Sequence, residues 1–431
     1  MERLISFAGI FILTGVAYAF SERRTIVPWG TLAGALALAL GLGALVFLVP
    51  QSTVLFLWLN TAVLKLLSYA GEGAKFLFGA LALSPGTKGE GGEPSLGYFM
   101  AFQMLPAVIF FSALMSLLYY LFLIQPLVRL FAKIFRRFMR LSGAEALSVS
   151  SNVFVGIEAV FSIRPFLAKL TRSEFFTVLT ACMASVASTT LAIYVSFLKD
   201  TFPSIAGHLI SASILSVPAS VIISKTMIPE SEAPLTMGKL PVEGRGPHAN
   251  FMGAVIDGAW EGMKLAAGIG TLLIAVLGLV ALLNDFIHKG GTFLPGHPEL
   301  SMQKILGWIM IPFAWCLGLS SHDLIPAAGL LGERWILTEV VAYRDLARLA
   351  AEGVIRDART VVVMSYALCG FAHVASVAIF VGGISALVPS RRDEIAGLGM
   401  KALFAAFLAT LITGCIAGVF FTSVQGHVLS F

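Results

Sequence analysis

Long apolar stretches constrain the fold of this chain more than any other feature. Of its 431 residues, 58% are hydrophobic and only 12% are charged, whereas soluble domains carry about 25% charged residues. Several stretches reach the roughly 20 residues that a helix needs to cross a bilayer, and they lack the alternating polarity of membrane β-strands. A helix satisfies its backbone hydrogen bonds within one segment, as lipid requires. The sequence therefore predicts an all-α, multi-pass membrane protein.

The charge and the cysteines exclude two other classes of function. A net charge of +5 could suggest a nucleic-acid partner in a soluble protein. In a membrane protein, basic residues collect in cytoplasmic loops instead, so we expect no nucleic acid. The four cysteines show neither CxxC nor metal-ligand spacing and are predicted to pack among apolar residues: Cys182, Cys316, Cys369 and Cys415.

The apolar pattern predicts about eight transmembrane helices and two irregular regions. The helices are expected at 4–20, 26–49, 97–124, 174–199, 205–228, 251–287, 360–388 and 395–424. Residues 51–80 contain polar interruptions and predict an interfacial helix. Segments 142–166 and 302–343 carry carboxylates and helix breakers, which membranes tolerate where the backbone lines a cavity. Both segments therefore predict re-entrant hairpins.

Each predicted hairpin is followed by a helix with a polar break, one at 184–190 and one at 369–373. This order occurs twice and predicts an inverted internal repeat, a common architecture of transporters. We expect four regions: scaffold helices with the interfacial helix at 1–141, the first hairpin and broken helix at 142–228, a loop and long scaffold helix at 229–301, and the second hairpin, broken helix and last helix at 302–431.

Ionisable side chains inside membrane segments are costly and indicate a functional site by default. Glu158 and Glu339 lie within apolar runs, one in each predicted hairpin. Each carboxylate could bind a solute, balance a cation or form a structural ion pair. Arg164 is near enough in sequence to pair with Glu158, and Arg334 or Arg344 with Glu339, so both interpretations stay open here.

Three further polar residues stand beside the predicted helix breaks. His373 is a candidate for binding a solute, for proton coupling or simply for packing. Asn152 and Ser185 bear neutral oxygen atoms, and sodium binds such oxygens together with the carbonyls of unwound backbone. Helix-bridging hydrogen bonds are the ordinary role of such side chains in membranes. A cation site at Asn152 and Ser185 is the functional alternative.

With these residues in this order, the chain resembles the concentrative nucleoside transporter family over essentially its full length. Most of the matching motifs lie in the predicted hairpins and broken helices. They are Phe102-Gln103-Met104-Leu105-Pro106, Ser142-Gly143-Ala144-Glu145, Asn152-Val153-Phe154-Val155-Gly156, Ile163-Arg164-Pro165-Phe166, Glu339-Val340-Val341-Ala342-Tyr343 and Tyr366-Ala367-Leu368-Cys369-Gly370-Phe371-Ala372.

The resemblance implies a homotrimer in the inner (plasma) membrane, each protomer having a scaffold domain and a transport domain that moves as an elevator. It implies cation-coupled nucleoside uptake, with sodium or a proton as the coupling ion and no other cofactor. The positions matching the family's sodium site are Asn152, Val155, Ser185 and Val186. The positions matching its substrate site are Ile157, Glu158, Glu339, Phe371, His373 and Ser376.

The chain departs from the family pattern where the substrate is bound. After the motif that ends at Gly156, the family usually has Gln-Thr-Glu-Ala-Pro, whereas this chain continues Ile157-Glu158-Ala159-Val160 and is one residue short before Arg164. The family's ribose-contacting asparagine is replaced by His373. The resemblance therefore implies the family's scaffold with an altered pocket.

We expect a secondary active transporter that imports nucleosides or nucleoside-like solutes. A proton-coupled carrier of a different polar metabolite is the alternative among transporters. A receptor that keeps the fold without transporting is the alternative from another class, because fold and function separate readily. The sequence contains neither HExxH nor GxSxG, so it gives no support to an enzyme of those types.

Overall fold

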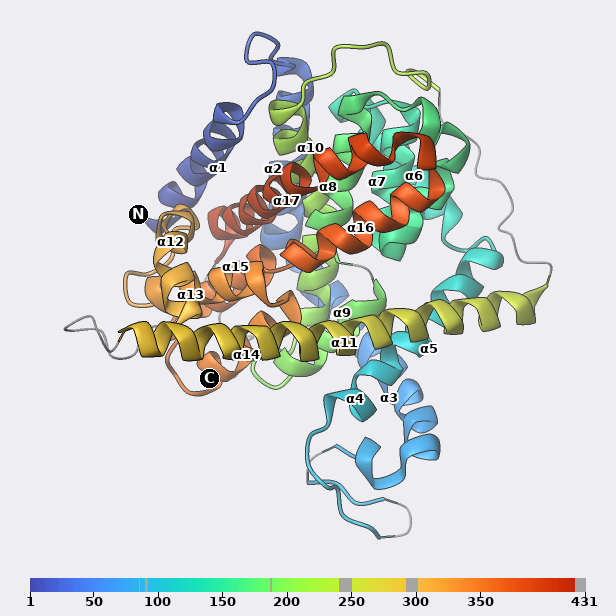
Figure 1. Ribbon diagram of the computed structural model, residues 1–431, viewed down its shortest axis with the longest axis vertical. Helices are drawn as coiled ribbons and strands as arrows, with labels where there is room; N and C mark the ends of the chain where they lie inside the picture. The colour runs from blue at the N-terminus through green and yellow to red at the C-terminus, as the bar shows by residue number, and fades with distance from the viewer. Residues whose placement is uncertain (85, 90–91, 187, 240–249, 292–300, 423–431) are drawn as a thin grey trace.

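The computed structural model of the chain describes residues 1–84, 86–89, 92–186, 188–239, 250–291 and 301–422. Within these ranges the chain consists of helices and loops, and the only β-type pairing is one isolated bridge between Lys88 and Pro94. The helices form a bundle, with the long helix α11 (Phe251–Gly291) lying along its outside (Figure 1). The predicted all-α fold is confirmed.

The first half of the repeat contains the predicted hairpin and a broken helix. The hairpin consists of α7 (Gly143–Val155) and the tighter η2 (Gly156–Lys169). The broken helix consists of α8 (Arg172–Ala184) and α9 (Ser188–Leu198), so the break predicted beside Ser185 is present. The half ends with the central helix α10 (Ile205–Met227), in which nearly every residue is buried.

The second half has the same order and ends with the other central helix. Its elements are α12 (Met302–Cys316), α13 (Leu324–Ile336), α14 (Glu339–Ala351), α15 (Ala358–Ala367), α16 (Val374–Leu387), η3 (Pro389–Arg391) and α17 (Arg392–Phe420). The helix predicted at 360–388 is thus α15 and α16, with a break between them. Such a break exposes backbone groups that the surrounding protein must satisfy.

The boundaries predicted for the second hairpin were wrong. Segment 302–343 contains a separate helix, α12, and only part of the hairpin formed by α13 and α14. The breakers around Pro326 lie where α13 begins, and the hairpin turns at Leu337 and Thr338 instead. Proline is tolerated in the first turn of a helix because the N–H it lacks would have no partner there.

The remaining elements precede the first hairpin. They are α1 (Glu2–Ala19), α2 (Trp29–Leu48), α3 (Pro50–Phe78), η1 (Gly79–Ala82), α4 (Met100–Gln103), α5 (Leu105–Tyr120) and α6 (Gln125–Met139). The helix predicted at 97–124 is therefore shorter and has a kink near Met104. The amphipathic α6 carries basic residues on its exposed side.

Seven helices in the described ranges are long and apolar enough to cross a membrane. They include Val54–Ala82, which we predicted to be interfacial, and exclude the two broken helices, whose halves are too short. Their burial separates them sharply: 89% of the Ile205–Met227 window and 83% of the Pro389–Phe420 window are buried, against 12–28% for the other five. Helices α10 and α17 therefore form the centre, and the others present apolar faces outward.

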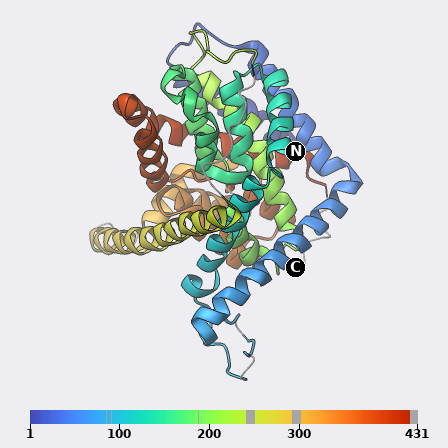
Figure 2. The same cartoon turned by 90° about the vertical axis from the view of Figure 1, so that its right-hand side faces the viewer.

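Helices α5 and α11 pack chiefly against each other. The two helices approach closely because glycines on α11 face α5: a Cβ atom on Gly262 would lie 2.7 Å from the Cα atom of Ile109. Small residues allow this kind of contact between membrane helices, where dispersion forces replace the hydrophobic effect. Both views show α11 running along the outside of the bundle (Figures 1 and 2).

Helix α1 is attached to the repeat at both ends. Near its start, the Ser6 hydroxyl oxygen accepts a hydrogen bond from Arg359 at 2.8 Å. In the loop after it, Glu22 contacts Arg172 at 2.9 Å and Lys401 at 2.6 Å, at the beginning of α8 and in α17. Helix α1 also packs along α17. It is therefore joined to both halves of the repeat.

Replacing Glu22 by glutamine should lower the thermal stability of the protein modestly at neutral pH. The hydrogen bond from Arg172, and then that from Lys401, lower the pKa of Glu22 from 4.5 to about 2, against the opposing effect of desolvation. Because the folded-state pKa is depressed, the stabilisation is complete well above pH 4.5 and is lost as the pH falls towards 2.

We expect the melting temperature of Glu22→Gln to lie roughly 1–3 °C below that of the unmodified protein at pH 7, since the carboxylate is partly exposed to solvent. Melting curves of the detergent-solubilised protein would show this difference and its decrease between pH 5 and pH 3. A difference that does not change with pH would contradict the assignment to this ion pair.

Candidate functional site

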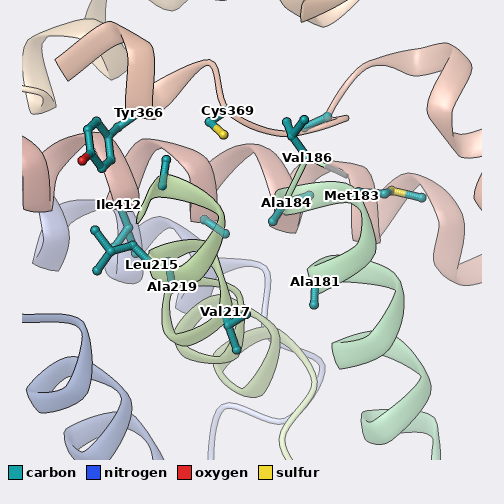
Figure 3. Packing of buried hydrophobic residues seen from close by; sticks show 14 of the residues in the cluster. Ala181, Met183, Ala184, Val186, Leu215, Val217, Ala219, Tyr366, Cys369 and Ile412 are labelled. Atoms are coloured by element: carbon teal, nitrogen blue, oxygen red, sulfur yellow. The ribbon is translucent and has the colours of Figure 1, made fainter. Parts of the chain in front are cut away.

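The two helix breaks meet inside the bundle. The N–H of Phe371, in the break after α15, donates to the carbonyl of Ser185, in the break after α8, at 3.4 Å. Gly370 makes this approach possible: a Cβ atom there would lie 2.8 Å from the Ala184 carbonyl oxygen. Figure 3 shows Ala184 and Val186 beside Cys369. The unwound backbone of each half is thus placed against the other.

A cluster of oxygen atoms joins the first hairpin to the first break. The amide nitrogen of Asn152 donates to the Ala181 carbonyl at 2.9 Å and to the Ser185 hydroxyl, which itself donates to Ala181 at 3.2 Å. The Val186 carbonyl accepts from Ser213 at 3.3 Å. The structure thus brings Asn152 and Ser185, two of the predicted sodium-site residues, into contact.

The Asn152 side chain keeps one acceptor free. Its Oδ1 atom is buried and has no hydrogen-bond partner in the described part of the structure. A buried acceptor without a partner is unfavourable, and a hard cation such as sodium would satisfy it because such ions take oxygen ligands. The chemistry of this cluster therefore fits sodium.

A second polar cluster links the second hairpin to the break after α15. Glu339, at the start of α14, accepts a hydrogen bond from the Tyr194 hydroxyl of α9 at 2.8 Å. Its other oxygen lies 3.3 Å from Nε2 of His373. All three side chains are buried. Two predicted substrate-site residues, Glu339 and His373, are therefore neighbours.

The surroundings of His373 define its tautomer. The backbone N–H of Ser376 donates to Nδ1 of His373 at 3.2 Å, so Nδ1 acts as an acceptor. In a neutral imidazole the proton then resides on Nε2, the nitrogen that faces Glu339. The Ser376 hydroxyl donates to the His373 carbonyl at 2.6 Å. His373 thus caps the start of α16, and the contact with Ser376 orients the imidazole.

Glu339 retains an unused acceptor despite these neighbours. The Oε2 atom is buried and has no hydrogen-bond partner among the described residues, because the contact with His373 lacks hydrogen-bond geometry. An ionised carboxylate away from water is stabilised by donated hydrogen bonds. A hydroxyl or amine of a bound solute would supply them.

The structural ion pairs considered for Glu339 are not present. Arg344 pairs with Asp345 at 3.1 Å on the exposed side of α14. The Arg334 guanidinium instead donates to the Ala367 carbonyl and to the Thr410 hydroxyl. Of the alternatives left open by the sequence, a role for Glu339 in binding remains the better supported.

The other predicted site residues are placed less completely. The ring of Phe371 is partly buried and lies 6.4 Å from that of His373. The side chains of Val155, Ile157 and Glu158 lie outside the part of the structure that is described. The base end of the predicted pocket, and the pairing of Glu158 with Arg164, therefore remain predictions.

Tyr194 also belongs to this cluster and was not predicted from the sequence. This residue lies in the apolar run of α9, 145 positions before Glu339, and only the packing of α9 against α14 brings the two together. A tyrosine in a membrane segment is too common to indicate a site by itself. A buried tyrosine hydroxyl needs a hydrogen-bond partner, and only the structure shows that this partner is Glu339.

Comparison with known proteins identifies the family. Residues 8–81 and 208–418 match the N-terminal and C-terminal parts of the Na+ dependent nucleoside transporter family, and residues 101–201 match a region described as nucleoside recognition, or Gate. The chain is 33% identical over 425 residues to an uncharacterized transporter of Haemophilus influenzae, covering 97% of this chain and 98% of that one. It is 34% identical over 420 residues to nucleoside permease NupC of Helicobacter pylori, with 97% of each covered.

Solved structures agree with this assignment. The fold is similar to that of CNTnw in an inward-facing substrate-bound state, with 33% identity, a TM-score of 0.87 and coverage of 97% of this chain and 98% of that one. A CNTnw variant in an outward-facing state gives the same TM-score and coverage at 32% identity. The family matches cover most of the sequence, and full-length relatives are more than 30% identical. The chain therefore belongs to the sodium-dependent nucleoside transporter family, whose members are multi-pass membrane transporters and not enzymes.

Proposed function

We propose that this protein imports nucleosides or nucleoside-like solutes by coupling their entry to the downhill movement of a cation. The observation that carries the proposal is the buried Glu339 carboxylate, which accepts a hydrogen bond from Tyr194 and keeps one oxygen without a hydrogen-bond partner in the described part of the chain. Vicinal hydroxyls of a sugar are donors suited to such an oxygen. Relatives named as nucleoside permease and sodium/nucleoside cotransporter support the substrate class.

In this proposal one polar cluster binds the coupling ion and the other binds the solute. Sodium would bind at Asn152 and Ser185, with the Val155 and Val186 carbonyls completing its oxygen ligands. The sugar would contact Glu339, His373 and Ser376. Phe371 would lie beside the sugar, with Ile157 and Glu158 at the base end. A solute that lacks donors for Glu339 would leave the carboxylate unsatisfied and be rejected.

We further propose an elevator movement in a homotrimer. The two hairpins, the broken helices and the central helices α10 and α17 would form the moving body. The α5–α11 pair packs mostly on itself and offers a large apolar outer face, which suits a scaffold and a contact between protomers. The attachment of α1 to both halves of the repeat favours placing it with the moving body, in place of the scaffold role that we expected for it as part of residues 1–141.

Uptake into proteoliposomes tests the function directly. Labelled purine and pyrimidine nucleosides should accumulate when sodium is higher outside, and should not accumulate when choline replaces sodium. Uptake driven by a pH gradient alone would instead support the proton-coupled alternative. Binding of nucleosides without accumulation under any gradient would support a receptor.

Replacing His373 by asparagine should separate solute binding from proton coupling. The imidazole faces Glu339 at 3.3 Å, and an asparagine amide can also donate to a hydroxyl but does not titrate near neutral pH. If sodium is the coupling ion, we expect His373→Asn to change the KM for nucleosides by roughly 3- to 30-fold. The sodium dependence of uptake, measured between pH 5.5 and 8, should stay the same. A pH dependence of uptake that is present in the unmodified protein and altered in His373→Asn would instead support proton coupling through His373.

A further inference from the structure

Arg334 is a buried cation without a carboxylate partner among the described residues. It lies in α13 with 0% of its surface exposed. The other buried basic side chains in the described ranges have acidic partners: Lys225 lies 2.5 Å from Glu145, and Arg359 lies 3.6 Å from Glu2. A guanidinium remains charged even when buried. Its charge inside the bundle therefore requires an explanation.

The immediate neighbours of Arg334 are neutral. One nitrogen donates to the Ala367 carbonyl, at the end of α15, and to the Thr410 hydroxyl at 3.0 Å. The Phe407 ring centroid lies 6.0 Å from the guanidinium carbon. The Nε and Nη2 atoms have no hydrogen-bond partner among the described residues. The carbonyl end of a helix favours a cation, but these contacts leave the unit charge uncompensated.

Arg334 and Glu339 contact opposite ends of the same helix break. The two residues flank the turn of the second hairpin. Arg334 binds Ala367, where α15 ends, and Glu339 lies against His373, just before α16 begins. The tip of the second hairpin thus carries both charged residues, and each contacts one end of the unwound backbone between α15 and α16.

The remaining buried charges lie at the ends of helices. Described residues of this kind are found in the first or last turn of their helices or immediately before it: Glu145, Glu174, Lys225, Asp323 and Arg359. Arg334 and Glu339 also lie at helix ends, in the last turn of α13 and at the first residue of α14, but they flank the turn of the second hairpin. Among the described buried charges, these two are therefore the pair at this turn.

We propose that Arg334 is the permanent counter-charge of Glu339 in the transport cycle. The inference rests on the proposed function. Arg334 then offsets the charge of Glu339, so that this pair adds no net charge to the moving body. Membrane voltage acts on a step in proportion to the charge that the step moves. Replacing Arg334 by a neutral residue therefore adds one negative charge to the moving body, both loaded and empty, and changes how each movement responds to voltage.

Arg334→Met and Arg334→Lys separate charge from packing. Methionine removes the charge while keeping an unbranched side chain, and lysine keeps the charge. In Arg334→Met the moving body carries one more negative charge, in both the loaded and the empty state, than in the unmodified protein or in Arg334→Lys. We expect nucleoside exchange at saturating sodium on both sides to respond equally to imposed voltage in the unmodified protein and in Arg334→Lys. In Arg334→Met, the voltage response should differ from theirs by the effect of one elementary charge.

The sodium concentration for half-maximal uptake gives a second measurement. Removing a fixed positive charge near the site strengthens binding of a cation, so this concentration should fall in Arg334→Met and stay close to the unmodified value in Arg334→Lys. Equal voltage responses and equal sodium dependence in the two variants would overturn the proposal.

Arg334→Gln provides the same test if Arg334→Met fails to fold. Glutamine is neutral but its amide can still donate a hydrogen bond to the Ala367 carbonyl, and its voltage response should differ from that of the unmodified protein in the way expected for Arg334→Met. A voltage response of Arg334→Gln equal to that of the unmodified protein would overturn the proposal. Absence of cation-dependent uptake in the unmodified protein would refute the proposed function instead, so the two failures are distinguishable.

Discussion

Glu339→Gln should reduce kcat/KM for nucleoside uptake by about 100-fold or more. Hydrogen bonds to a charged group contribute about 1.5–3 kcal/mol each, and a sugar can donate two of them to the carboxylate. Glutamine keeps the size of the side chain and can still accept from Tyr194, 2.8 Å away in the unmodified protein. The fold should therefore survive, and the loss should appear in initial rates of uptake into proteoliposomes.

Glu352→Gln is the matched control for this substitution. Glu352 follows the last residue of the same helix, α14, and its side chain is 49% exposed and pairs with Arg348 on the surface. We expect uptake by this variant to equal that of the unmodified protein. If uptake by Glu339→Gln also equals that of the unmodified protein, Glu339 does not bind the substrate.

Asn152→Ala should raise the sodium concentration needed for half-maximal uptake by roughly 10- to 100-fold. The substitution removes Oδ1, the buried oxygen that has no hydrogen-bond partner among the described residues, and with it a charge-assisted contact of about 1.5–3 kcal/mol. It also removes the bridge from the first hairpin to Ala181 and Ser185. The measurement is the sodium dependence of uptake at saturating nucleoside.

Ser150→Ala is a control from the same helix. Ser150 is buried in α7, but its hydroxyl donates to the Ala146 carbonyl within that helix at 2.6 Å. Its removal should leave the sodium dependence unchanged. Both variants should have melting temperatures close to that of the unmodified protein. If Asn152→Ala then has the same sodium dependence as Ser150→Ala, the coupling ion does not bind at Asn152.

The features that could be predicted from the sequence are those with a local signal. Apolar length gave most of the helices, and helix breakers beside polar residues located the first hairpin and the breaks near Ser185 and His373. These signals are local because an interrupted helix in a membrane needs specific residues at the interruption itself. The expectation that Glu339 belongs to a site used the same argument for a buried charge.

Features that depend on packing were not accessible in this way. Pro326 indicated a hairpin turn, yet proline is compatible with both a turn and a helix start, and the structure places it in the first turn of α13. Arg334 lies five positions from Glu339, which suggested an ion pair. The hairpin turn between them instead directs the guanidinium to Ala367. Tyr194 joins Glu339 only through the packing of distant helices.

The attachment of α1 to both halves of the repeat also has a practical consequence for spectroscopy. A fluorophore in the loop after α1, for example at the exposed Arg23, would travel with the body to which Glu22 is tied through Arg172 and Lys401. A second fluorophore at Lys264, on the exposed face of α11, would stay with the scaffold. Energy transfer between these two labels could then follow single transport cycles without any change to the residues that bind the solute or the ion.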